Sequence, residues 1–248
     1  MNKIIISLII ILNYLNAGNI KLALSANVSY AINDLIKEFN KNNPNTKVQV
    51  TIGGSGKLTA QIKHNAPYQL FMSANMDYPN ALYNDKIAIT KPIVYTQGGL
   101  AYLTRKKLDL SKGINIIKDK NIIRVAIANP KTAPYGKATK EALQNAKLYN
   151  INKHKFVYGE SISQTVAYTA TATDIGFIAL SALYSNKMSK YKKGINWEKV
   201  DVKLYTPIKQ GIVILKKGEN NPEVKAFYDF ILTTEAKNIF KKFGYINN

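Results

Sequence analysis

In the first part of the chain, apolar residues occur in two patterns, one typical of strands and one typical of helices. Short apolar runs at 20–24, 48–52 and 70–73 predict strands. After the first run, apolar residues recur every third or fourth position and predict an amphipathic helix: Val28, Ala31, Ile32, Leu35, Ile36 and Phe39. Asn27 comes just before this stripe and suits the N-cap of the helix. The order strand, helix, strand, helix, strand is typical of a parallel sheet with helices on its faces.

The same alternation returns in the rest of the chain. Pro134 follows a turn and predicts a helix that runs to about residue 146, and Ser161 opens another helix. Pro222 suits the first turn of a long final helix. The strands predicted in this part are 99–103, 124–128, 174–180, 202–205 and 212–215.

Two α/β units joined by extended segments predict a two-lobed α/β fold, in which each lobe is a mostly parallel sheet flanked by helices. We expect the chain to cross between the lobes near 93–98 and 205–211. Lobe 1 would then be discontinuous and comprise 18–95 plus 211–248, while lobe 2 would comprise 96–210. A single wide α/β sheet is the alternative organisation. Only the two-lobed organisation predicts a cleft between lobes.

The N-terminus has the layout of a secretory signal peptide. Lys3 precedes an apolar run at 4–12, and small residues follow near Ala17. The run is too short to span a bilayer as a stable anchor. We therefore expect 1–17 to be removed by cleavage near Ala17, and the mature protein to be soluble and periplasmic.

Composition removes several classes of function. The chain has no cysteine, which excludes disulfides, cysteine zinc sites and a cysteine nucleophile. His64 and His154 each lie beside lysines, which favours the solvent-exposed surface over a metal or catalytic site. The net charge is +20, but the lysines are scattered and no nucleic-acid module is visible, so we expect no nucleic-acid partner. The sequence also lacks a nucleophile elbow and has few carboxylates, and we expect no enzymatic activity.

Candidate chemistry gathers where predicted strands end and helices begin. Free backbone N–H groups and the helix dipole favour an anion at such positions, and glycines let a ligand approach the backbone. Each junction taken alone is more often a plain helix cap, but four of them in both halves favour an anion site. The four junctions are 25–27 (SAN), 53–56 (GGSG), 133–136 (APYG) and 159–162 (GESI).

In this order the segments resemble the periplasmic molybdate-binding proteins of ABC transporters. LALSANVSYA at 22–31 is similar to the first ligand loop of that family, and GGSGKLTAQI at 53–62 to the second. Further similar stretches cover most of the mature chain: 66–75, 129–143, 174–178 and 224–244.

The resemblance implies a type II periplasmic-binding fold that closes on a tetrahedral oxyanion through uncharged donors. It implies that Ser55 donates through its hydroxyl and N–H, and that Asn27 stands where the family usually has its other ligand serine, with Ser25 nearby. Tyr135 and Ile162 match positions that donate backbone N–H groups. Ala179 stands where the family often has a ligand tyrosine, and Gln69 replaces a common aspartate.

The function implied is capture of molybdate or tungstate in the interlobe cleft and delivery to an ABC permease with its ATPase. The metal would be bound only as its oxyanion, with no direct metal ligand and no cofactor, by a monomer. Two alternatives remain open at the level of sequence. One is a binding protein for another small anion, such as sulfate, phosphate or an organic acid; the other is a basic exported surface-binding protein. An extracytoplasmic hydrolase has the least support.

Overall fold

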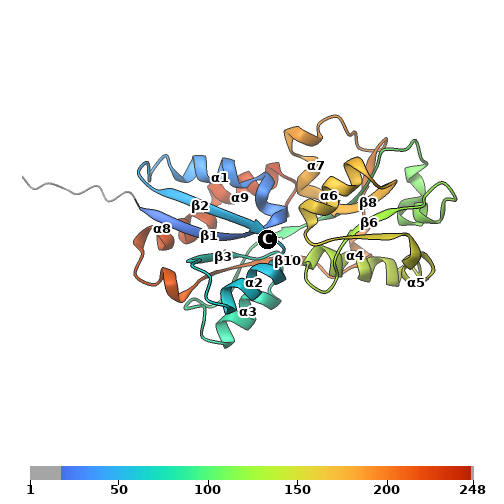
Figure 1. Cartoon of the computed structure of the whole chain (residues 1–248). Helices are drawn as coiled ribbons and strands as arrows, with labels where there is room; N and C mark the ends of the chain where they lie inside the picture. The colour runs from blue at the N-terminus through green and yellow to red at the C-terminus, as the bar shows by residue number, and fades with distance from the viewer. Residues whose placement is uncertain (1–17, 247–248) are drawn as a thin grey trace, which may run out of the picture.

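The computed structural model describes residues 18–246, so the predicted signal peptide lies outside the described residues. Two lobes stand side by side (Figure 1), and each is built on a five-stranded sheet. The strand order is β2-β1-β3-β10-β4 in lobe 1 and β7-β6-β8-β5-β9 in lobe 2. Within 18–246, no helix is long and apolar enough to cross a membrane.

The strands of lobe 1 are β1 Asn19–Ser25, β2 Lys47–Gly53, β3 Leu70–Met72, β4 Ile93–Gly98 and β10 Ile208–Ile214. The strands of lobe 2 are β5 Leu100–Thr104, β6 Val125–Ala128, β7 Phe156–Gly159, β8 Ile175–Ala179 and β9 Trp197–Lys199. The α-helices are α1 Ile32–Phe39, α2 Ser55–Lys63, α3 Asp77–Asn84, α4 Pro134–Asn145, α5 Tyr149–Asn152, α6 Ile162–Thr171, α7 Leu180–Leu183, α8 Pro222–Ile231 and α9 Thr234–Lys242.

Apolar cores on both faces of each sheet hold the helices in place. In lobe 1, α1, α8 and α9 pack on one face, and α2 and α3 pack on the other. In lobe 2, α4 covers one face, while α6 and α7 cover the opposite face (Figure 1). The strands at the centre of each sheet are therefore buried on both faces, which explains their continuous apolar runs.

The sheets are mixed, whereas the sequence led us to expect mostly parallel ones. β1 pairs in parallel with β2 and β3, but β10 runs antiparallel to both β3 and β4. In lobe 2, β6 pairs in parallel with β7 and β8, but β5 runs antiparallel to β8 and β9. The chain enters lobe 1 through β10 and lobe 2 through β5. Because neither strand is reached through a right-handed crossover helix from a neighbouring strand, neither has to run parallel to its neighbours.

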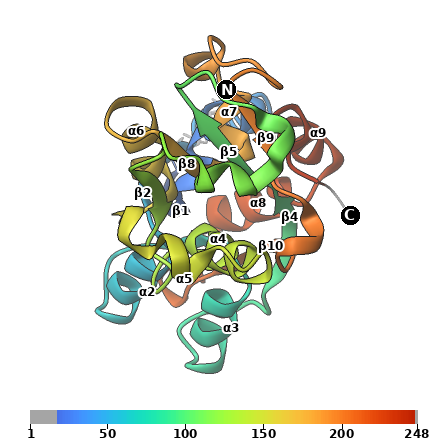
Figure 2. The same ribbon diagram turned by 90° about the vertical axis from the view of Figure 1, so that its right-hand side faces the viewer.

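Two segments run between the lobes. The chain leaves lobe 1 through β4, passes Gly99 into β5, and returns to lobe 1 through β10. The end of the described chain joins them, because the backbone of Ile246 exchanges two hydrogen bonds of 2.9 Å with Gln97 of β4. Figure 2 shows β4 and β10 close to the C-terminal end. The lobe borders expected at 95/96 and 210/211 fall inside β4 and β10 themselves.

Three local predictions need correction. The helix expected from Val28 begins as a 3-10 helix, Ala26–Tyr30, and becomes α-helical only at Ile32; Asn27 lies inside it, and the N-cap position belongs to Ser25. The strand expected at 202–205 is a 3-10 helix, Val202–Leu204, because the Asp201 side chain accepts from the N–H of Lys203. The long final helix is divided into α8 and α9, because Thr233 caps a new helix by accepting from the N–H of Ala236.

Asp174 ties three segments of lobe 2 together, and its removal is expected to destabilise this lobe. Its carboxylate accepts from the N–H groups of Ile123 (2.7 Å) and Arg124 (2.8 Å), and it pairs with Lys106 at 2.8 Å. Partial burial acts to raise the pKa of Asp174, but the bonds from Lys106 and the two N–H groups outweigh it and lower the pKa. Asp174→Asn is expected to lower the free energy of unfolding by about 2 kcal/mol at neutral pH.

The pH dependence has a definite sign because this pKa is lower in the folded state. The contribution of the carboxylate is present above the ordinary aspartate pKa of about 3.9 and is lost as the pH falls through the folded-state value. Urea unfolding at pH 7 and at pH 3 measures this: the difference between the wild type and Asp174→Asn should shrink in acid. The control is Asp85→Asn, which breaks only the exposed pair with Lys63. Equal losses for the two variants at pH 7 would contradict the assignment.

Candidate ligand-binding site

The four strand-to-helix junctions singled out in the sequence converge on one small cavity between the lobes. The carboxyl ends of the parallel strands in both sheets face each other there, as expected for ligand sites of open α/β sheets. The cavity has a volume of about 10 Å³, far below the range of about 300–1,000 Å³ typical of pockets for larger organic ligands. Its lining residues are Ser25, Ala26, Asn27, Gly53, Gly54, Ser55, Ala74, Ala133, Pro134, Tyr135 and Ile162.

Ser55 carries a hydroxyl whose proton direction can be worked out. Its Oγ accepts from the backbone N–H of Ala74 at 3.0 Å and lies 2.5 Å from the Oγ of Ser25. A serine hydroxyl has one proton and two lone pairs. When Ser25 donates to Ser55, both lone pairs of Ser55 are occupied and its own proton is free for a ligand. Ser55 is 1% exposed, so that proton can be used only inside the cavity.

Lobe 2 contributes backbone donors at two helix starts. Tyr135 follows Pro134 at the beginning of α4, and Ile162 is the first residue of α6. The first N–H groups of an α-helix have no acceptor within the helix, and the helix dipole makes them attractive to negative charge. The side chain of Ser161 caps α6 by accepting from the N–H of Gln164, which leaves the N–H of Ile162 available.

Asn27 lies inside a buried network that joins both lobes. Its Nδ2 donates to Oε1 of Gln210 (2.9 Å) and to the hydroxyl of Tyr245 (3.0 Å). Its backbone oxygen accepts from the hydroxyls of Ser181 (2.9 Å) and Tyr245 (2.8 Å). Its Oδ1 has no hydrogen-bond partner among the described residues, although Asn27 is fully buried. A buried acceptor without a partner is uncommon in folded proteins and indicates a functional position.

The site is electrically neutral. Among the described residues that line the cavity, none carries a charged side chain. The tyrosines around it stay protonated, because burial raises the pKa values of Tyr95, Tyr135 and Tyr245 well above the ordinary value. Fixed dipoles in a site with a low dielectric constant stabilise an anion without a counter-charge. Uncharged hydroxyl and N–H groups from both lobes are thus the chemistry offered to a ligand.

Contacts between the lobes close the mouth of the cavity. The N–H of Gly56 donates to the carbonyl of Thr132 at 3.0 Å, which joins α2 of lobe 1 to the loop before α4. Ion pairs between the lobes add to it at the surface: Lys57 with Glu160 at 3.6 Å, and Lys137 with Asp77 at 3.1 Å. Because both pairs are exposed, each contributes little to stability. They place charge outside the cavity and leave its interior neutral.

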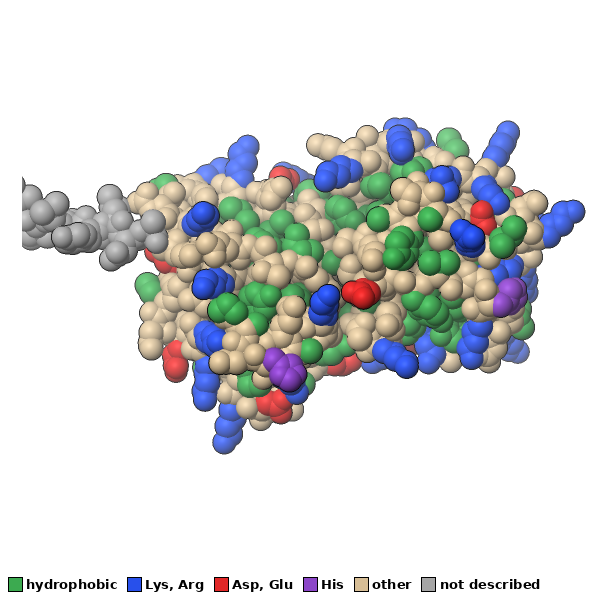
Figure 3. Space-filling view, viewed as in Figure 1, with side chains coloured by type: hydrophobic (Ala, Val, Ile, Leu, Met, Phe, Trp, Pro, Cys, Tyr) green, Lys and Arg blue, Asp and Glu red, His purple; other side chains and the backbone are tan. Residues whose placement is uncertain are grey.

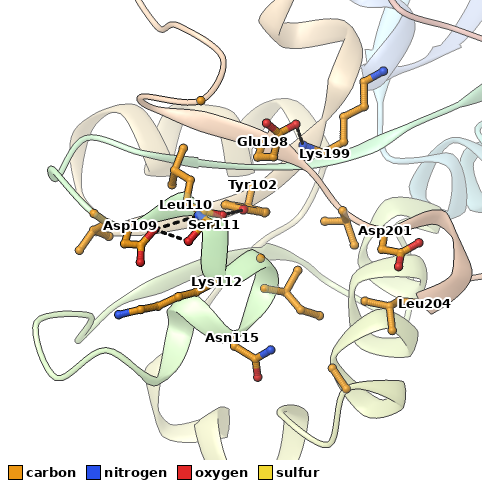
Figure 4. Close-up of a pocket in the computed structure, with 16 residues that line it drawn as sticks. Tyr102, Asp109, Leu110, Ser111, Lys112, Asn115, Glu198, Lys199, Asp201 and Leu204 are labelled. Carbon is orange, nitrogen blue, oxygen red and sulfur yellow. Dashed lines mark hydrogen bonds between the residues drawn. The ribbon is translucent and has the colours of Figure 1, made fainter.

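A larger cavity lies within lobe 2 (Figure 4), and none of the residues that line it belongs to the four junctions. Its lining carries the carboxylates of Asp109, Glu198 and Asp201 beside Lys112 and Lys199. Asp109 is already engaged by the N–H and hydroxyl of Ser111, at 3.1 and 2.6 Å. The three carboxylates outnumber the two lysines and so favour an anion less than the neutral cavity does, and the wall of Leu110 and Leu204 offers it no donors. Size alone therefore does not identify the anion site.

The comparisons with known proteins agree with this geometry. A family described as bacterial extracellular solute-binding protein matches residues 20–246. The chain belongs to this family. It is 32% identical to the molybdate-binding protein of Azotobacter vinelandii over 92% of this chain and 90% of that protein. It is 33% identical to the molybdate-binding protein of Rhodobacter capsulatus over 93% of this chain and 89% of that protein.

Solved structures of solute-binding proteins show the same fold. The periplasmic molybdate-binding protein of Azotobacter vinelandii superposes with a TM-score of 0.85 and 27% identity, covering 92% of this chain and 99% of that chain. A sulfate-binding protein of Mycobacterium tuberculosis superposes with a TM-score of 0.73 at 12% identity, which shows the fold alone. The two-lobed type II periplasmic-binding architecture expected from the sequence is therefore confirmed.

The structure brings together five of the six residues named from the sequence. Asn27, Ser55, Tyr135, Ile162 and Ser25 all line the cavity, and Ala179 does not. Ala179 is the last residue of β8, where it pairs with Leu100.

Three residues beside the cavity were missed: Ala74, Gln210 and Tyr245. Gln210 had a signal in the sequence, because it is a polar residue at the start of an apolar run in β10. Tyr245 had none, since only the fold returns the end of the chain to the cavity.

Proposed function

We propose that the protein is an exported solute-binding protein that captures molybdate or tungstate between its lobes. The observation that carries the proposal is the neutral cavity in which the Ser55 hydroxyl of lobe 1 meets the helix starts at Tyr135 and Ile162 of lobe 2. A tetrahedral dianion needs donors from several directions, and only closure of both lobes supplies them. The names of the relatives support molybdate as the ligand.

The energetics suit a receptor. About six hydrogen bonds to a charged ligand at about 1.5–3 kcal/mol each must offset desolvation and closure of the lobes. Micromolar to nanomolar binding requires a net gain of about 8–12 kcal/mol. Donors that carry no charge also let the ligand leave without separating a buried ion pair. The protein would bind and release its ligand unchanged, without a cofactor and without catalysis.

The remaining expectations belong to the same proposal. The signal peptide 1–17 would be removed on export, and the monomer would deliver its ligand to an ABC permease with its ATPase. The distribution of basic residues gives less support to binding of nucleic acid or lipid than to binding of a small anion. Figure 3 shows Lys and Arg side chains spread over both lobes of the face in view, where a docking surface would gather them.

A second candidate ligand is a small oxyanion that still carries a proton, such as hydrogen phosphate. The observation that favours it is Oδ1 of Asn27, which could accept that proton. Competition calorimetry with molybdate, tungstate, sulfate and phosphate separates the candidates. We expect molybdate and tungstate to bind more tightly than phosphate, because no described residue that lines the cavity has a carboxylate to accept a proton.

Ser55→Ala tests the proposed function directly. The variant removes one donor to a charged ligand, worth about 1.5–3 kcal/mol, so molybdate affinity should fall about ten- to a hundredfold. It also deprives the buried N–H of Ala74 of its acceptor, so the free energy of unfolding should fall by about 1 kcal/mol. Isothermal calorimetry and urea unfolding measure the two effects.

Ser73→Ala is the matched control for this substitution. Ser73 is also a fully buried serine of lobe 1, but it bonds with Asn75 and does not line the cavity. It should show a similar small loss of stability with unchanged affinity. If both variants bind molybdate as tightly as the wild type, the site is assigned to the wrong hydroxyl.

A further inference from the structure

Gln210 occupies a central position between the two lobes. It is fully buried in β10, at an irregularity in the pairing with β4 that falls between Gln210 and Gly211. Such irregularities turn a side chain in a direction that a regular strand does not allow. Gly98 on β4 leaves room for it, since a Cβ there would lie 2.6 Å from Nε2 of Gln210.

The amide of Gln210 connects ligand-site residues of both lobes. Its Oε1 accepts from Nδ2 of Asn27 in lobe 1 and from the hydroxyl of Tyr95 on β4, both at 2.9 Å. Its Nε2 donates to the hydroxyl of Tyr135 in lobe 2 at 3.3 Å. Gln210 does not line the cavity, so any effect on the ligand must pass through these neighbours.

The orientation of Asn27 raises a problem for an anion receptor. Both protons of its Nδ2 are used by Gln210 and Tyr245, and the group left over is the acceptor Oδ1. An acceptor oxygen repels a fully ionised oxyanion. A half-turn of the Asn27 amide would exchange the two atoms and place an N–H donor where Oδ1 now lies.

The network permits this half-turn only if Gln210 turns as well. With both amides reversed, Nε2 of Gln210 donates to Oδ1 of Asn27, and Oε1 of Gln210 accepts from Tyr135. The hydroxyl of Tyr135 changes from acceptor to donor. Tyr245 has one hydroxyl proton, which it gives to the backbone oxygen of Asn27; in the reversed network that proton turns to Oδ1 of Asn27, and the backbone oxygen keeps its bond from Ser181. The hydroxyl of Tyr95 accepts from Gln210 and donates to the carbonyl of Ser73, 3.3 Å away. Every contact between the side chains keeps one donor and one acceptor, because a phenol can play either part.

We propose that Gln210 is a positioning residue for the ligand, which turns together with Asn27 so that Asn27 presents Nδ2–H to the bound oxyanion. This inference rests on the proposed function and adds to it a coupled turn of two side-chain amides. The oxyanion supplies the acceptor that the freed Nδ2 requires, so binding selects the reversed pair. Through Tyr135, the same turn links the arrival of the anion at lobe 1 to the ligand-binding helix start of lobe 2.

The first experiment is a double-mutant cycle measured by calorimetry with molybdate. Gln210→Met keeps the size of the side chain and removes its donor and acceptor. We expect it to weaken binding about tenfold in the wild-type background and less than about twofold in the Asn27→Ala background. Gln97→Met, on the adjacent strand β4, is the matched control; the contacts of Gln97 with Lys209 and Ile246 are backbone pairings, and affinity should be unchanged.

The second experiment reads the turn itself and needs no variant of Gln210. Side-chain amide resonances of ¹⁵N-labelled protein should shift for both Asn27 and Gln210 when molybdate is added, and not for Gln97. A shift at Asn27 without one at Gln210 would overturn the proposal, as would equal losses from Gln210→Met in both backgrounds. If the wild type bound none of the oxyanions, the proposed function would fail too; binding without coupling refutes only the role of Gln210.

Discussion

Asn27→Asp is expected to weaken molybdate binding about a thousandfold while the protein remains folded. The substitution changes hardly any volume but places a carboxylate in a cavity whose lining is otherwise uncharged. Two like charges about 4 Å apart repel by about 4 kcal/mol at an effective dielectric constant of 20. That energy corresponds to about three orders of magnitude in affinity. Calorimetry at pH 8 measures the loss, and thermal unfolding verifies the fold.

The loss should depend on pH with a known sign. Burial disfavours the charged form of a carboxyl group, so the pKa of an aspartate at position 27 would be raised. Lowering the pH from 8 towards 5 should therefore protonate it and restore part of the affinity, whereas the wild-type site has no group that titrates there. An affinity that stays equally low at both pH values would argue against charge as the cause.

Asn129→Asp controls for the added charge. The side-chain oxygen of Asn129 accepts from the N–H of Lys131 at 3.0 Å in a turn of lobe 2, and a carboxylate can take over that bond. Asn129 does not line the cavity. This variant should bind molybdate as the wild type does. A loss of similar size would mean that net charge, and not position 27, governs affinity.

Gly54→Ala is expected to hinder closure of the lobes without harming either lobe. A Cβ at this position would lie 2.8 Å from the carbonyl oxygen of Glu160, which belongs to the opposite lobe. Overpacking of this kind costs about 1–3 kcal/mol. Because the clash exists only in the closed form, it should appear as a loss of affinity of about ten- to a hundredfold and not as a loss of lobe stability. Calorimetry and urea unfolding separate the two.

Gly53→Ala provides a neighbouring control. A Cβ there would meet only the side chain of Leu58, at 3.2 Å and within lobe 1. Small-angle scattering in the presence of molybdate adds a direct measure of closure: Gly54→Ala should keep a larger radius of gyration than Gly53→Ala. Identical radii and affinities for the two variants would show that the contact with Glu160 does not limit closure.

The convergence of the site could be predicted from the sequence because it follows from general rules. Ser55, Tyr135 and Ile162 each stand at the start of the helix that follows a strand. The carboxyl ends of parallel strands share one edge of a sheet, and two lobes that face each other bring their edges together. The order of strands and helices was enough to bring the junctions together, whereas the choice of these three residues within the junctions came from the resemblance to the molybdate-binding family.

The network around Asn27 could not be predicted, because its members come from separate parts of the chain. Gln210 meets Asn27 through the antiparallel course of β10, Tyr245 through the return of the C-terminal segment, and Ser181 through the contact of α7 in lobe 2 with lobe 1. Periodicity reports which face of an element is buried and not which distant residue covers it. The 3-10 geometry of Ala26–Tyr30 could likewise not be read from periodicity.

The place of β10 in its sheet has a consequence for how the polypeptide acquires its structure. β3 and β4 do not pair with each other; β10 lies between them and joins β4 to the rest of the sheet, and β10 is synthesised after the whole of lobe 2. Lobe 2 is continuous in sequence and can assemble from contacts of shorter range. The other sheet has to wait for residues near the end of the chain, so its formation is slow relative to local folding. In a nascent chain of this topology, the sheet of lobe 1 stays incomplete until Ile208–Ile214 has emerged.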